Sequence, residues 1–188
     1  MSRIPALDPS SATGHVKETL DGLHKRLGVT PNLFRVAAQS PATLDALVGL
    51  VGSISKGKLN ARSREAVAIA VSNFNGCDYC LSAHTALGRG AGLREDALAK
   101  ARDAVADDPK LGATLRFARL VAEQRGHVSA SDLESVRAAG ANDAEILEIV
   151  MNVAAATFTN YLNVVAETDL DFPAASGQVA PSTRTRGA

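Results

Sequence analysis

The segment over residues 146–158, ILEIVMNVAAATF, constrains the fold more than any other part of the sequence, because it is apolar on nearly every side of a helix. Only Glu148 and Asn152 interrupt it, and these two residues are four apart, so they share one helical face. A shorter apolar run, EAVAIAV, begins at Glu65. A helix without a wide polar face is buried on most sides. We therefore expect both segments to be core helices or to form a subunit interface.

Helical periodicity extends over most of the chain, whereas the period-2 alternation of a half-buried strand is almost absent. Ser40 before Pro41, and Asp108 before Pro109, have the pattern of an N-cap followed by proline in the first turn. The sequence predicts an all-α, multi-helix bundle. Its helices are expected over residues 14–27, 32–39, 41–56, 61–74, 77–90, 93–106, 109–125, 130–139 and 142–166.

The chain of 188 residues suits one domain. We expect an extended lead-in over residues 1–13, a helical domain over residues 14–170 and a flexible tail over residues 171–188, which is rich in Pro, Ser, Thr and Gly.

Charge and hydropathy narrow the class of partner. The 20 basic residues balance 20 acidic ones, which gives no electrostatic reason to expect nucleic acid or an anionic membrane as partner. No apolar run approaches the roughly 18 residues of a membrane span, and the N-terminal residues lack the apolar segment of a signal peptide. We therefore expect a cytoplasmic protein without a membrane or nucleic-acid partner.

The only two cysteines, Cys77 and Cys80, are separated by two residues. A pair so close constrains little of the unfolded chain, and in a reducing compartment it is more often catalytic or metal-binding than a structural disulfide. Asn75-Gly76 breaks the preceding helix, so a new helix is expected to begin at or beside Cys77. The first turn of a helix favours a thiolate over a thiol, and the thiolate is the nucleophile.

Helical spacing places Cys77, Cys80 and His84 on one face within two turns, with the imidazole of His84 within reach of the Cys80 thiol. This arrangement suits a redox cycle in which one sulfur is oxidised to sulfenic acid and the second condenses with it to a disulfide. Glu65 is a candidate to orient His84. Alternatively, Glu65 is a first-turn carboxylate paired with Arg62.

Other interpretations of the cluster stay open. Cys77, Cys80 and His84, with Glu65 as a fourth ligand, have side chains that bind zinc or iron. The dithiol also suits a non-enzymatic module that senses redox state. As a further alternative, the two cysteines are small buried hydrophobes.

The string Glu65-x11-Cys77-x2-Cys80-x3-His84 resembles the alkyl hydroperoxidase D and carboxymuconolactone decarboxylase-like family. Its flanks resemble the peroxidase-related branch of that family, in Thr30-Pro31-Asn32-Leu33-Phe34 with Ser40-Pro41, in Asn160-Tyr161-Leu162-Asn163, and in Asp169-Leu170-Asp171-Phe172-Pro173. The resemblance spans about residues 30–173.

This resemblance implies an all-helical fold assembled as a homo-oligomer, a trimer or hexamer, and a peroxidase that needs no cofactor. Glu65 and His84 would deprotonate Cys80, which would attack the peroxide substrate. Cys77 would resolve the product as a disulfide and meet an external dithiol reductant, whose identity is unknown. The characterised hydroperoxidase has a histidine where this chain has Tyr79, which we expect to pack beside the site. Asn160 and Asn163 are expected to be polar groups at a helix end.

Overall fold

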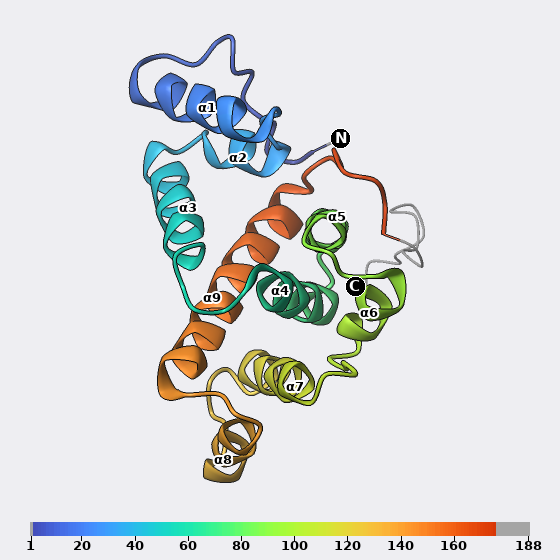
Figure 1. The fold of residues 1–188 in the computed structure, drawn as a ribbon. Helices are drawn as coiled ribbons and strands as arrows, with labels where there is room; N and C mark the ends of the chain where they lie inside the picture. Colours follow the sequence, from blue (N-terminus) through green and yellow to red (C-terminus); the bar gives the residue numbers. More distant parts are fainter. Residues whose placement is uncertain (1, 176–188) are drawn as a thin grey trace, which may run out of the picture.

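The computed structural model describes residues 2–175, and within this range the chain is all-helical and without strands (Figure 1). The predicted fold class is confirmed. The helices are α1 (Gly14–Leu27), α2 (Asn32–Ala37), α3 (Pro41–Ile54), α4 (Ala61–Asn75), α5 (Asp78–Gly90), α6 (Glu95–Arg102), α7 (Pro109–Glu123), α8 (Ala130–Ala138) and α9 (Asp143–Ala166).

Side-chain caps explain why the predicted boundaries are close to the observed ones. Ser40 accepts a hydrogen bond from the Thr43 amide at the start of α3, and Asp108 accepts one from Leu111 at the start of α7. The largest difference concerns residues 93–106, of which only Glu95–Arg102 is helical. Arg94 is extended and Ala104 has a positive φ of 57°, so the backbone leaves the helical region on both sides.

Helix α4 lies at the centre of the bundle, surrounded by α5, α6, α7 and α9 (Figure 1). Its residues from Ala66 to Ser72 are all buried, as the apolar run predicted. With α7 and α9 they form the larger hydrophobic core, which includes Ile69, Leu115 and Ile149. This core holds α4 rigidly, and Glu65 with it.

A second hydrophobic core joins α1, α2 and α3 and includes Leu20, Leu44 and Leu47. Phe158 and Leu162 of α9 pack against it, so α9 contacts both cores. A third, smaller cluster contains Cys77, Tyr79, Cys80 and Ala83, with Leu33 and Phe172 packed against it.

Helix α9 corrects the expectation that no segment approaches a membrane span. By length and composition it is apolar enough to cross a membrane. Half of its most apolar stretch is buried inside the fold. Its outward side exposes large apolar residues, among them Leu147, Tyr161 and Val165.

The lead-in over residues 2–13 is not helical and includes a turn at residues 9–11, and the Leu7 amide donates to the Arg35 carbonyl. The predicted tail begins too early, because residues 171–175 pack on the domain. Asp171 accepts a hydrogen bond from the Asn32 amide at 2.6 Å, and the Phe172 ring meets the Tyr79 ring edge-on. Residues 176–188 of that predicted tail lie outside the described range.

Candidate active site

The turn between α4 and α5 positions the two cysteines. Gly76 ends α4 with a left-handed φ of 68°, a conformation that glycine adopts without steric cost. The next amide, of Cys77, donates to the Ser72 carbonyl at 3.0 Å. Cys77 is then the N-cap of α5, and its Sγ accepts a hydrogen bond from the Cys80 amide at 3.2 Å. The predicted helix start at or beside Cys77 is confirmed.

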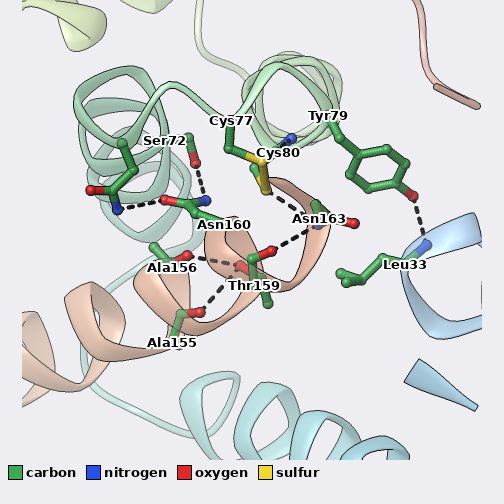
Figure 2. The surroundings of a disulfide bond; sticks show 11 residues. Leu33, Ser72, Cys77, Tyr79, Cys80, Ala155, Ala156, Thr159, Asn160 and Asn163 are labelled. Atoms are coloured by element: carbon green, nitrogen blue, oxygen red, sulfur yellow. Dashed lines mark hydrogen bonds between the residues drawn. A yellow bond between two sulfur atoms is a disulfide. The ribbon is translucent and has the colours of Figure 1, made fainter. Parts of the chain in front are cut away.

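Cys77 and Cys80 are joined by a disulfide, with their Cα atoms 5.3 Å apart (Figure 2). Each residue is only 2% exposed. The disulfide is therefore buried, and it lies at the N-terminal, positive end of the α5 dipole.

Glu65 and His84 meet across the α4–α5 interface. The Glu65 Oε2 lies 2.8 Å from His84 Nδ1, and both side chains are mostly buried. Arg62 instead donates from Nε to the Ala91 carbonyl, so the alternative pairing of Glu65 with Arg62 is wrong. A carboxylate at Nδ1 favours the tautomer that carries its proton there, which leaves Nε2 as the basic nitrogen.

Cys80, His84 and Glu65 line one cavity of about 430 Å³, whereas Cys77 is not among its lining residues. The volume lies in the range of small-molecule sites. The walls come from both hydrophobic cores and from the segment after α9, and most of the lining is apolar, including Leu33, Phe34, Val51, Ile54, Leu87 and Phe172. A hydrocarbon-bearing molecule in this cavity would therefore contact Cys80 rather than Cys77.

Tyr79 lies beside the cysteines and lines the same cavity. Its hydroxyl accepts a hydrogen bond from the Leu33 amide at 3.1 Å (Figure 2). Burial raises the pKa of the Tyr79 phenol far above its usual value, and the nearby Asp171 carboxylate acts in the same direction. The phenol stays neutral at physiological pH and is no substitute for an imidazole base.

Asn160 and Asn163 were expected to be helix-end polar groups, but both are buried, at 0% and 3% exposure. Asn160 donates to Ser72 Oγ at 3.0 Å and accepts from Asn75 Nδ2, which ties α9 to α4. Asn163 donates from Nδ2 to Cys80 Sγ at 3.3 Å. The sequence feature that indicates such contacts is an amide side chain on the inward face of an apolar helix, because a buried polar group needs a hydrogen-bond partner.

The arrangement of the candidate ligand side chains does not favour a metal site. Between residues 2 and 175, no group of three or more His, Cys, Asp or Glu side chains is arranged to hold a metal ion. The alternative ligand set of Cys77, Cys80 and His84 is therefore not assembled in this disulfide form.

Comparison with known proteins concerns the family and the fold. The sequence profile of the Carboxymuconolactone decarboxylase family matches residues 41–124, which run from α3 to the end of α7 and include the cysteine pair. Among curated proteins, none matches the chain in sequence.

Several solved structures share the fold. One is the alkylhydroperoxidase AhpD core of an uncharacterized peroxidase-related protein from Ralstonia eutropha JMP134, with a TM-score of 0.83 and 23% identity over 90% of this chain and 92% of that one. Another is an uncharacterized peroxidase-related protein from Silicibacter sp. TM1040, with a TM-score of 0.77 and 23% identity over 88% of this chain and 91% of the other.

The debrominase Bmp8 is also similar, with a TM-score of 0.76 and 20% identity over 89% of this chain and 91% of that one. A variant of Bmp8 was solved in complex with 2,3,4-tribromopyrrole. At these identities the solved structures show only that the fold is shared. The family match is a separate finding, and it covers the segment that contains Cys77 and Cys80. Residues 41–124 thus match the Carboxymuconolactone decarboxylase family, and the fold is that of AhpD-like, peroxidase-related proteins.

Proposed function

We propose that this protein is a dithiol peroxidase that reduces organic hydroperoxides through a Cys77/Cys80 dithiol–disulfide cycle. The observation that carries the proposal is the joint placement of Cys80, His84 and Glu65 on one apolar cavity, with Cys77 in disulfide reach behind Cys80. A nucleophile, a base and a group that orients the base are the parts that thiol catalysis needs.

In the attacking step, His84 Nε2 takes the Cys80 proton while Glu65 holds Nδ1 and stabilises the imidazolium. The Cys80 thiolate attacks the terminal oxygen of the hydroperoxide. An S–O bond forms, the O–O bond breaks, and the alkoxide takes its proton from His84. The products are a Cys80 sulfenic acid and an alcohol.

In the resolving step, the Cys77 thiol attacks the Cys80 sulfenic acid. An S–S bond forms, and the hydroxyl leaves as water with the Cys77 proton. An external dithiol then reduces the disulfide by thiol–disulfide exchange and is itself oxidised to a disulfide. Each turnover therefore transfers two electrons from the dithiol to the peroxide.

The cavity supports a substrate with an apolar organic group. Burial of hydrocarbon against residues such as Phe34, Ile54 and Phe172 stabilises the complex in proportion to the apolar area removed from water. Hydrogen peroxide has no apolar group, so burial against these residues would not stabilise its complex. We therefore propose that the substrates are organic hydroperoxides and that the protein detoxifies them. We also propose that it acts in the cytoplasm, with a dithiol protein or small dithiol as reductant.

Single-turnover kinetics test this function. Reduced protein is mixed with one equivalent of cumene hydroperoxide, and peroxide loss and free thiols are followed together. We expect one peroxide consumed for two thiols lost, and a rate constant larger than that for hydrogen peroxide. Sustained turnover with a dithiol separates an enzyme from a redox sensor, because a sensor would be oxidised once and then stop.

A second candidate is reductive dehalogenation of an apolar haloaromatic compound, favoured by the mostly apolar cavity that Cys80 lines. The overall reaction would convert Ar–X and two thiols into Ar–H, HX and a disulfide. Halide release from 2,3,4-tribromopyrrole by reduced protein, with loss of two thiols, would support this function. No halide above that of free dithiol would reject it.

A further inference from the structure

We infer that Asn163 is a catalytic residue of the proposed peroxidase reaction. Its Nδ2 stabilises the Cys80 thiolate, and its Oδ1 accepts the hydrogen bond of the hydroperoxide O–H. This inference rests on the proposed function and gives a role to a polar side chain that contacts the attacking sulfur.

The orientation of the amide follows from its partners. Nδ2 lies 2.9 Å from the Thr159 carbonyl oxygen and 3.3 Å from Cys80 Sγ (Figure 2). Because a carbonyl oxygen only accepts, the amide nitrogen must face Thr159, and its second proton points at the sulfur. The flipped amide would set two oxygens against each other. Asn163 therefore presents a fixed N–H to the sulfur.

A fixed N–H donor has a defined effect on thiol chemistry. Hydrogen bonding to the charged form of a group favours that form, so the contact favours the thiolate. Cys80 is 2% exposed and lies in the first turn of α5, so few water molecules are available to solvate its charge. The donor from Asn163 thus replaces solvation that burial removes.

The other end of the amide is unused. Asn163 Oδ1 is buried and has no hydrogen-bond partner among residues 2–175. It points away from the disulfide, towards the side where Tyr79 and Leu33 lie, and all three residues line the cavity (Figure 2). A buried acceptor without a partner is unusual in a folded protein, and at a cavity it is satisfied when a donor arrives.

A hydroperoxide supplies that donor on the atom that reacts. Its terminal oxygen carries the proton, and the same oxygen must meet Cys80 Sγ. With the O–H donated to Oδ1, one planar amide holds both the thiolate and the oxygen it attacks. That oxygen becomes the sulfenic hydroxyl and keeps its proton, so Oδ1 stays paired through the step. The alkoxide leaves and is protonated by His84, as in the proposed mechanism.

The test uses the full chain with Cys77→Ser, in which Cys80 is the only thiol. Asn163→Ala is compared with Asn160→Ala, which removes an equally buried amide from the same helix but does not touch the sulfur. Asn163→Ser is the second variant in case the alanine variant does not fold. Far-UV circular dichroism and thermal unfolding establish folding in each.

The pH dependence of iodoacetamide alkylation reports the sulfur contact. We expect Asn163→Ala to raise the pKa of the Cys80 thiol by about one unit, whereas Asn160→Ala leaves it unchanged. The peroxide contact is measured at a pH where Cys80 is fully ionised in every variant. There we expect Asn163→Ala to react about tenfold more slowly with cumene hydroperoxide, but equally fast with iodoacetamide.

An unchanged thiol pKa together with an unchanged peroxide rate in folded Asn163→Ala overturns the inference. A peroxide rate that recovers completely at full ionisation overturns the role of Oδ1. Failure of the proposed function looks different, because the Cys77→Ser parent would then react with peroxide no faster than free cysteine. The alkylation profiles would still report the contact between Asn163 and the sulfur.

Discussion

The Glu65 carboxylate and the His84 imidazole are joined at 2.8 Å across two helices, although they lie 19 positions apart in the chain. This contact fixes which ring nitrogen of His84 is engaged. It also couples the central helix α4 to the cysteine-bearing helix α5, so the base and its orienting group share the rigidity of the core.

His84→Ala is expected to slow peroxide reduction by about 10²–10⁴-fold, the usual span for a positioned acid–base group. Glu65→Gln keeps an oxygen at Nδ1 but removes the charge that stabilises the imidazolium, so we expect a smaller loss of about tenfold. Stopped-flow consumption of cumene hydroperoxide measures both. Glu95→Gln is the matched control, because Glu95 pairs with Arg89 on the surface. A larger loss in Glu65→Gln than in His84→Ala would contradict these roles.

The two cysteines are expected to respond differently to substitution. Cys80→Ser should abolish peroxide consumption, because Cys80 lines the cavity and Cys77 does not. Cys77→Ser should allow one attack and leave a sulfenic acid, which a dimedone probe labels and mass spectrometry locates on Cys80. Turnover that persists in Cys80→Ser, with the label on Cys77, would reverse the assignment.

Tyr79 links the site to folding stability at alkaline pH. Its pKa is raised in the folded state, mainly by burial, so the unfolded state releases the phenolic proton first. The stabilisation is complete below the unfolded pKa of about 10 and is lost as pH rises towards the folded pKa. We therefore expect the free energy of unfolding to fall progressively above about pH 9, and to fall less steeply in Tyr79→Phe.

Urea unfolding at several pH values measures this effect. Tyr79→Phe should also lose about 1 kcal/mol at neutral pH, because the Leu33 amide loses its acceptor. The chain has two tyrosines, so the Tyr161→Phe variant isolates Tyr79 in an absorbance titration. Ionisation of Tyr79 in that variant near pH 10, without unfolding, would show that burial does not control its pKa.

The outward face of α9 predicts self-association. Leu147, Tyr161 and Val165 are each at least 60% exposed, and large apolar side chains along one helix are typical of an interface. Sedimentation should give a multiple of the 19.5 kDa chain mass. Val165→Lys should shift the equilibrium towards monomer, whereas Val105→Lys, on the loop after α6, should not. A monomer at micromolar concentration in the wild type would contradict the prediction.

Much of the local structure was determined by the sequence alone. Apolar periodicity predicted the helices, and caps such as Ser40 and Asp108 act within a few residues of their own position. The Asn75-Gly76 break and the spacing of Cys77, Cys80 and His84 likewise concern one turn and one helix. Such relations depend on helical geometry, which does not change with the fold.

Contacts between elements distant in the chain were decided only by the tertiary structure. From the sequence alone, either His84 or Arg62 was a possible partner of Glu65. The packing of α4 on α5 brings Glu65 to His84, whereas Arg62 donates to the Ala91 carbonyl. The sequence predicted that Asn163 is a polar group at a helix end. The packing of α9 on α5 instead brings its amide to Cys80 Sγ, 83 positions away in the chain. Periodicity shows which face of a helix is buried, but not which residue of another helix lies opposite, because that depends on how all the helices pack together.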